Sequence, residues 1–323
     1  MQLAKLNGLT QAEMLTVNGQ LMREPSDPAF KITVDTTKAG SASDTFVLPL
    51  PSGFTYDCVV DWGDGTEAIT TSGNKSHTWA TGGIKQISIT GTLPTIKFLD
   101  TGDKLKAISI DNWGTMPWLS LRESFRGCAN LNSVAEGGNF LGVTDGFAAW
   151  FGCSSLAAFP ALAFPAANSL SYAWRGCTGL TAFPLITFGG TSNTSFDYAW
   201  YGCTGLTAFP MLDLSMFSGI TLYATWYGCN GLLTFPTLAL GNVTVLNQTW
   251  QGCSKITTSP ETFLSNLTDG KIASVANACN GCVAMVGNSY PFWDWTTEPT
   301  TKTDAYNLCA ALTDYATIPA AYK

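Results

Sequence analysis

Ten cysteines and one histidine are the residues of this 323-residue chain that could bind a metal or carry out nucleophilic chemistry. The single histidine, His77, excludes any site that needs two imidazoles and argues against a Ser-His-Asp triad. Cys279 and Cys282 form a C-x-x-C pair, but no second pair and no usable histidine completes the four ligands of a structural zinc site. We therefore expect no metal and no cofactor from these residues.

Carboxylates are too sparse in the middle of the chain for acid–base catalysis. Glycan-cleaving enzymes need two carboxyl groups about 5 to 9.5 Å apart. From residue 128 to residue 260 the acids are Glu136, Asp145, Asp197 and Asp213, each in a different segment of the repeat described below. No acid pair is encoded locally, so we expect a protein that is not an enzyme.

Eight of the cysteines mark a sequence repeat. Its best copies read AWFGCSSLAAFP (149–160), AWRGCTGLTAFP (173–184), AWYGCTGLTAFP (199–210) and TWYGCNGLLTFP (225–236), while TWQGCSKITTSP (249–260) diverges at its end. Successive marker cysteines are 25, 24, 26, 26, 24, 29 and 27 residues apart, and they are Cys128, Cys153, Cys177, Cys203, Cys229, Cys253, Cys282 and Cys309. A period near 25 predicts units that are stable only when stacked on their neighbours.

The apolar residues of one unit predict which side chains face inward. Trp200 and Cys203 share one face of a short helical turn, which the glycine between them tightens or ends. Leu206 and Phe209 continue the apolar pattern at every third position, which predicts an arc of chain with a short strand at LTAF, closed by Pro210. We expect an inward ladder of cysteines and an inward stack of tryptophans; disulfides between units and a sugar-stacking stripe are the alternatives.

The residue between Trp and Gly has no common size or polarity, as expected of a position that faces solvent. In successive units it is Phe151, Arg175, Tyr201, Tyr227 and Gln251. If the protein has a recognition stripe, we expect Arg175, Tyr201, Tyr227 and Gln251 to be its binding residues, or the variable arc at 189–197 to provide it. Surface loops without a binding role are the alternative.

The frame W-x-G-C-x-x-L-x-x-F-P resembles the BspA-like leucine-rich repeats of bacterial surface antigens, over about residues 120–320. Here Trp stands where that family usually has Phe, and the last two units are irregular, as terminal capping repeats often are. The resemblance implies a leucine-rich-repeat solenoid of about eight units over residues 121–323.

Residues 29–100 read as an all-β module. FKITVDTT, TFVLPL, YDCVVDW, ISIT and TIKF are short alternating or β-branched runs, and Gly63-Asp64-Gly65 predicts a tight hairpin. CVVDWGDGTEAIT followed by SHTWATGGIKQISITGT resembles a polycystic-kidney-disease-type Ig-like domain, which implies a β-sandwich followed by a connector at 101–120. Asp57, Asp61 and Asp64 could bind calcium or could simply form turns.

Residues 1–28 contain LNG and VNG eleven residues apart, a pattern similar to the N-termini of some tailed-bacteriophage virion proteins. The similarity implies a docking arm at 1–28 that binds other virion subunits. The N-terminus lacks the apolar region of a signal peptide, so we expect a chain that is mature, exported by another route, or not exported by the Sec pathway. We expect its thiols to be reduced.

The expected fold class is mixed α/β, mainly β, with an Ig-like β-sandwich followed by a leucine-rich-repeat solenoid. A net charge of −7 without a basic run, and the lack of an apolar stretch of 18 residues, predict no nucleic-acid binding and no membrane insertion. We expect a structural and recognition protein at the virion surface, oligomeric in its assembly: a tail adhesin, fibre-like appendage or head decoration that binds a host-surface glycan or protein. A bacterial cell-surface adhesin is the alternative, and a glycan depolymerase the third.

Overall fold

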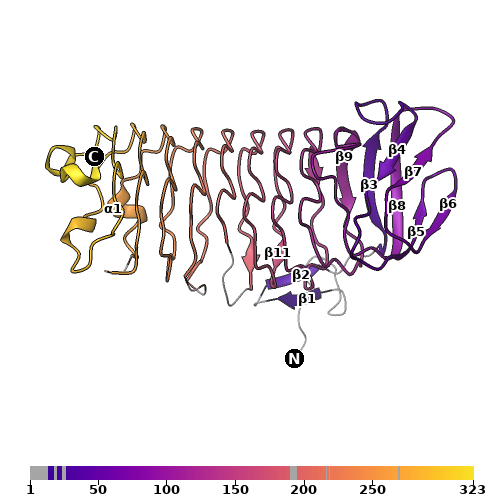
Figure 1. Ribbon diagram of the computed structural model, residues 1–323, viewed down its shortest axis with the longest axis horizontal. Coiled ribbons are helices and arrows are strands. Elements are labelled where there is room, and N and C mark those ends of the chain that lie inside the picture. The colour runs from indigo at the N-terminus through magenta and orange to yellow at the C-terminus, as the bar shows by residue number, and fades with distance from the viewer. Residues whose placement is uncertain are drawn as a thin grey trace, which may run out of the picture.

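The computed structural model describes residues 14–17, 20–23, 27–189, 195–215, 217, 219–267 and 270–323, and over 14–23 it describes the backbone alone. The described chain is mainly β, with one four-residue helix, α1 (Pro260–Phe263), and short 3-10 segments. Figure 1 shows an elongated molecule in which strands at one end are followed by a row of coils. Within these residues no helix has the length and apolar character needed to cross a membrane.

The strands at the N-terminal end form two sheets. The larger has the order β10-β9-β3-β8-β5-β6. Its members are β3 (Phe30–Asp35), β5 (Asp57–Asp61), β6 (Thr66–Ile69), β8 (Ile84–Thr92), β9 (Ala107–Asn112) and β10 (Ser133–Val134). The smaller pairs β4 (Thr45–Leu48) with β7 (Lys75–Thr78), and a separate hairpin pairs β1 (Met14–Val17) with β2 (Gln20–Arg23). Alternate residues of β3 are buried, as its alternating sequence predicts.

The expected hairpin at Gly63-Asp64-Gly65 is confirmed. It joins β5 to β6 through a four-residue loop, in which Trp62 N donates to the carbonyl of Gly65. Asp64 accepts at 2.8 Å from His77, whose ring stacks on Trp62 at 4.8 Å between centroids. The W-G-D-G turn is therefore held by the contact of Asp64 and Trp62 with His77 of β7, as well as by its own backbone hydrogen bond.

The expected strand at 95–98 is wrong. These residues form no sheet ladder; instead Phe98 N donates to the carbonyl of Ser124 and Asp100 N to that of Arg126, so they lie along the next coil. Pro94 contributes to this outcome because it has no N–H for a ladder. Residues 95–100 thus begin the stack of coils one unit earlier than the repeated frame shows.

The segment expected as a connector, 101–120, contains β9. This strand pairs antiparallel with β3 and parallel with β10, so it belongs to the sheet and to the first coils at once. The buried apolar residues form one cluster that runs from Phe30 to Tyr322. The two parts of the chain therefore share one continuous core.

Successive coils are joined by parallel contacts at the period of the sequence repeat. Single-residue bridges link Ser120 to Asp145, Asp145 to Ser169 and Ser169 to Ser195, and further bridges continue to Thr301. The expected strand at LTAF (206–209) is wrong, since one backbone bond per unit, such as that of Thr207 N to Thr181 O, is made there. Pro at the end of that run removes a donor that a ladder would need.

The interior is filled by parallel columns of like side chains, one member per coil. The five repeat tryptophans are fully buried, and their rings stack at 5.2 to 5.8 Å between centroids. The phenylalanines of the frame form another internal stack beside the tryptophans. They meet the indoles edge to face, as Phe209 meets Trp200 at 4.9 Å between centroids. The inward position predicted for the tryptophans is confirmed.

The turn between Trp and Cys is an i to i+3 turn and not a helix. Cys203 N donates to the carbonyl of Trp200, and Gly202 between them has a φ of +69°, which favours glycine. The Cys203 thiol lies 3.0 Å from the carbonyl of Trp174 in the preceding coil. The same thiol–carbonyl contact recurs in the other units, so cysteine supplies both a small apolar volume and a weak donor between coils.

Gly205 tests how closely the coils pack. A Cβ at this position would lie 2.4 Å from the carbonyl oxygen of Thr178 and 2.7 Å from that of Leu180. Replacing Gly205 with Ala is therefore expected to lower the free energy of unfolding by about 1 to 3 kcal/mol, the usual cost of overpacking. Gly65→Ala is the control, because no atom lies within 4 Å of its Cβ position, and urea unfolding should show a change within about 0.5 kcal/mol.

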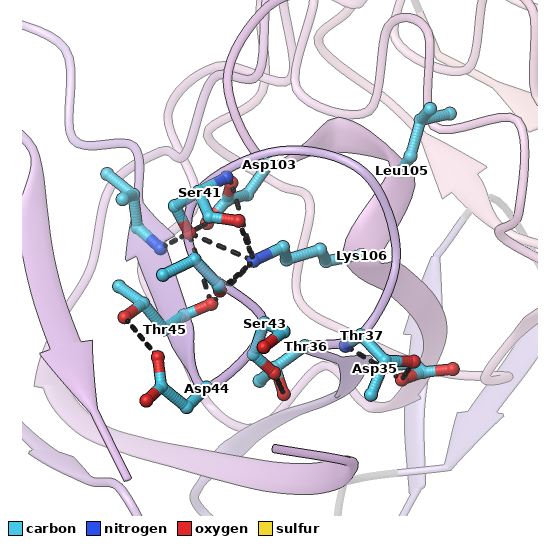
Figure 2. Close-up of polar contacts among 12 residues, drawn as sticks. Asp35, Thr36, Thr37, Ser41, Ser43, Asp44, Thr45, Asp103, Leu105 and Lys106 are labelled. Atoms are coloured by element: carbon cyan, nitrogen blue, oxygen red, sulfur yellow. Dashed lines mark hydrogen bonds and ion pairs between the residues drawn. The ribbon is translucent and has the colours of Figure 1, made fainter. Parts of the chain in front are cut away.

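A buried ion pair fastens the loop between β3 and β4 to the start of the coils (Figure 2). Lys106 is fully buried, and its Nζ donates to the carbonyls of Ala42 at 2.8 Å and Thr45 at 2.7 Å and to both oxygens of Ser41. Asp103, 3.9 Å from Nζ, accepts from the backbone N–H groups of Ser41 and Val47. The charges are thus neutralised and hydrogen-bonded by protein groups.

Candidate recognition surface

Two columns of cationic and aromatic side chains run along the outer edge of the coils. The outer column occupies the position between Trp and Gly and consists of Arg126, Phe151, Arg175, Tyr201, Tyr227 and Gln251. The second column lies two or three residues before the Trp and consists of Arg122, Phe147, Tyr172, Tyr198 and Tyr223. All are half-buried except Arg122, which is exposed. The structure therefore places all four predicted binding residues in one continuous row.

Backbone hydrogen bonds set the spacing of the outer column. Gly152 N donates to the carbonyl of Arg175, and Gly176 N donates to that of Tyr201, each at 2.8 Å. Each member therefore lies directly above the member of the preceding coil. Tyr201 and Tyr227 stack at 4.6 Å with their rings 3° from parallel.

The position expected to face solvent lies outside the core but is half-buried in every unit. Because stacking coils bring equivalent side chains within contact distance, the residues at this position cover one another's faces. Arg126 and Arg175 both lie over Phe151, at 5.1 and 5.2 Å from its centroid. Residues of different size and polarity in neighbouring units are thus complementary contact partners along the stack.

Arg175 is the point at which the two columns meet. Its guanidinium carbon lies 4.6 Å from the ring centroid of Tyr201, 5.5 Å from that of Tyr172 and 6.0 Å from that of Tyr198. Within the described part of the chain, this guanidinium has no ion pair and no hydrogen bond. It is a cation held by aromatic rings alone.

The second column was not predicted from the sequence. Tyr172 and Tyr198 stack at 4.6 Å, and Tyr198 lies 5.2 Å from Tyr223. Burial and a hydrogen bond with Tyr223 raise the pKa of Tyr198 to about 12, so its hydroxyl stays protonated at neutral pH. The recurring Y-A-W triplet is the signal that points to this column.

Tyr172 and Tyr198 adopt left-handed backbone, with φ values of +61° and +59°. Every unit has such a residue two positions before its aromatic or Cys, so the conformation belongs to the coil. Asn277 and Asp304, at the equivalent positions of later units, tolerate it better than a bulky aromatic residue does. Tyrosine here costs about 1 kcal/mol or more, which stacking of the rings offsets in part.

The surface begins beside a hollow of about 580 Å³ between the N-terminal sheets and the first coils. Lys97 and Arg122 line it, and both have carboxylate partners: Lys97 pairs with Glu123 at 2.8 Å, and Arg122 with Asp145 at 3.1 Å. Burial opposes ionisation of Glu123, but Lys97 and Arg126 hold its pKa below the ordinary value. The cations of the hollow are therefore already neutralised, unlike Arg175.

Of the acidic residues considered for calcium, Asp61 accepts from Gly63 N at 2.9 Å and Asp64 pairs with His77. Asp61 thus forms the turn that the simpler interpretation expected. Among the described residues no group of three His, Cys, Asp or Glu side chains is arranged to hold a metal ion. Residues 190–194 of the variable arc, and residues 1–13, 18, 19 and 24–26 of the expected docking arm, lie outside the described residues.

All ten cysteines are buried and unpaired, as the ladder prediction requires. Burial raises the pKa of Cys229 to about 12 and that of the Cys203 thiol well above its ordinary value. We expect the native protein to react slowly with a thiol reagent at pH 8, because the thiolate is the reactive form. In denaturant, titration should count ten thiols, and a count of two or fewer would refute the unpaired ladder.

The two sides of one unit should differ in their effect on stability. Phe209→Ala is expected to lower the free energy of unfolding by about 3 to 5 kcal/mol, since it empties a buried position. Tyr201→Ala removes the half-exposed ring that stacks on Tyr227 and should lower the free energy of unfolding by about 1 kcal/mol. Urea unfolding of the two variants measures the difference, and equal costs would contradict the inward and outward placement of these residues.

Comparison of the chain with protein-family models, curated proteins and solved structures finds no match.

Proposed function

We propose that this is a non-enzymatic recognition and structural protein that presents the outer and second columns to a ligand on a bacterial surface. The observation that supports it is Arg175, an uncompensated cation among half-exposed tyrosines on an otherwise weakly charged stack. From residue 128 to 260 only six residues are charged, so a cation without a partner is conspicuous there. Charge steering over long range is weak for such a surface, and short-range contacts dominate recognition.

The proposal includes the finer fold. The N-terminal sheets correspond to an Ig-like module of the polycystic-kidney-disease type, supported by the W-G-D-G turn between β5 and β6. The coils correspond to a leucine-rich-repeat solenoid of the BspA-like type, supported by the parallel bridges at the period of the repeat. In this assignment β9 belongs to both modules and fixes one against the other.

The proposed location is the surface of a phage virion, as a tail adhesin, fibre-like appendage or head decoration. The two Asn-Gly motifs of residues 1–28 support this location. In this scheme the arm binds neighbouring subunits, and the coils project outward. Gold-labelled antibody against the coils should decorate phage particles; labelling of bacterial envelopes in place of particles would favour a bacterial adhesin.

Binding to cells tests the recognition function. The purified, fluorescently labelled protein should bind intact bacteria saturably, and Tyr201→Ala combined with Tyr227→Ala should weaken the binding. Leu185→Ala is a matched control, because Leu185 is exposed and lies outside both columns. A lack of saturable binding to any envelope tested would overturn the proposal, and new reducing ends released from envelope glycans would show a depolymerase.

A further inference from the structure

Arg175 has donors but no acceptor in the described part of the chain. A guanidinium carries five N–H donors, and each of the other two arginines of the columns uses some of them on a carboxylate: Arg122 on Asp145 and Arg126 on Glu123. The nearest acids of the neighbouring units are engaged elsewhere. Asp145 bonds Arg122, and Asp197 accepts from Thr221 Oγ1 at 2.6 Å and from Tyr223 N at 2.9 Å.

The rings that surround Arg175 restrict the direction of approach. Phe151 belongs to the preceding coil and Tyr201 to the following one, and their centroids lie 5.2 and 4.6 Å from the guanidinium carbon. The cation therefore lies between aromatic rings of the two neighbouring coils. The N–H donors of a guanidinium lie in its plane, where two parallel N–H groups match two oxygens of one oxyanion.

The surroundings of Arg175 suit a sugar acid. The half-buried rings of Tyr172 and Tyr198 lie beside the guanidinium, with centroids 5.5 and 6.0 Å from its carbon, and they are held there at a backbone conformation that a bulky residue adopts at a cost. Aromatic rings contact the C–H surface of a saccharide, and a tyrosine also carries a hydroxyl that can bind a saccharide hydroxyl. A small inorganic anion would use the guanidinium alone.

We propose that Arg175, together with Tyr172 and Tyr198, binds the oxyanion of an acidic saccharide, with the carboxylate of a uronic or sialic acid as the preferred group. This inference rests on the proposed recognition function and names the ligand class of its site. A sugar phosphate offers the same two-oxygen edge and is the competing source of the anion. The planar pair of donors favours the planar carboxylate.

The test is equilibrium binding of single sugars to the full chain at low ionic strength. Glucuronate, galacturonate and N-acetylneuraminate are the carboxylate probes, glucose 6-phosphate and inorganic phosphate are the phosphate probes, and glucose is the neutral probe. We expect the carboxylate sugars to bind at least tenfold more tightly than glucose. Equal binding of glucose, or tighter binding of either phosphate probe, would overturn the carboxylate assignment.

Variants separate the charge of Arg175 from its shape. Arg175→Gln should reduce binding of the carboxylate sugars tenfold or more, and Arg175→Lys should recover only part of it, because the ammonium lacks the two-donor edge. Lys255→Gln is the control, since Lys255 is an exposed cation of the coils that lies outside both columns, and it should leave binding unchanged. Far-UV circular dichroism and the urea midpoint identify any variant that fails to fold. For such a variant, competition between the carboxylate and phosphate probes on the unaltered protein tests the carboxylate assignment instead.

The two proposals fail differently. If the unaltered protein binds cells and Arg175→Gln binds them equally well, the Arg175 site is wrong while the recognition function stands. If the unaltered protein binds no cells, the recognition function is wrong whatever the single sugars do.

Discussion

Raising the pH from 7 to about 9.5 under reducing conditions is expected to unfold this protein, because its thiols are protonated when folded and ionised when unfolded. Burial raises the pKa of Cys128, Cys153, Cys177 and Cys253 well above the ordinary value, and the remaining six cysteines shift in the same direction. In the unfolded chain each thiol has a pKa of about 8.5.

The sign follows from proton linkage. A group whose pKa is raised on folding contributes its full stability below the unfolded pKa and loses it as the pH rises toward the folded pKa. Each such thiol contributes a slope of about 1.4 kcal/mol per pH unit above 8.5. With ten thiols the loss by pH 9.5 is on the order of 10 kcal/mol, which is comparable with the whole stability of a typical domain.

The urea midpoint measured by tryptophan fluorescence from pH 7 to 10 tests this expectation. Cys203→Ala is the informative variant: it should be less stable at pH 7, where it leaves a small cavity, and its disadvantage should shrink by about 1.4 kcal/mol per pH unit above 8.5. A midpoint that stays constant between pH 7 and 9.5 would show that the thiols are not buried in the protonated form.

Lys106→Met is expected to lower the free energy of unfolding by about 3 to 5 kcal/mol. The substitution keeps most of the side-chain volume but leaves the carboxylate of Asp103, itself buried, without its cation. Removing one partner of a buried pair is costly because the other charge stays in a medium that solvates it poorly. Three carbonyl groups of the loop at 41–45 lose their donor as well.

Lys104→Met is the matched control, two residues away on the same 3-10 segment. Lys104 pairs with Asp100 at the surface, and a surface pair contributes about 0 to 1 kcal/mol. Urea unfolding at neutral pH compares the two variants. Equal stabilities for Lys104→Met and Lys106→Met would mean that the loop is not fastened by the buried charge.

Several features of this protein follow from its sequence alone. The period of the W-x-G-C frame determines the spacing of the coils, and apolar residues at every third position determine which side chains are buried. The glycine between Trp and Cys predicted a tightened turn, and the φ of +69° at Gly202 agrees with that prediction. The sequence also places Arg175, Tyr201, Tyr227 and Gln251 outside the core, since they vary within a fixed apolar frame.

Other features were decided only by the tertiary structure. β9 carries no repeat signature, yet it joins the sheet and the coils because it pairs with β3 on one side and with β10 on the other. Lys106 and Asp103 carry no recognisable pattern in the sequence, and they are buried because the loop at 41–45 packs over them. The aromatic columns, and with them the unpaired guanidinium of Arg175, exist because stacking brings residues about 25 positions apart into contact, a relation between coils that no local pattern encodes.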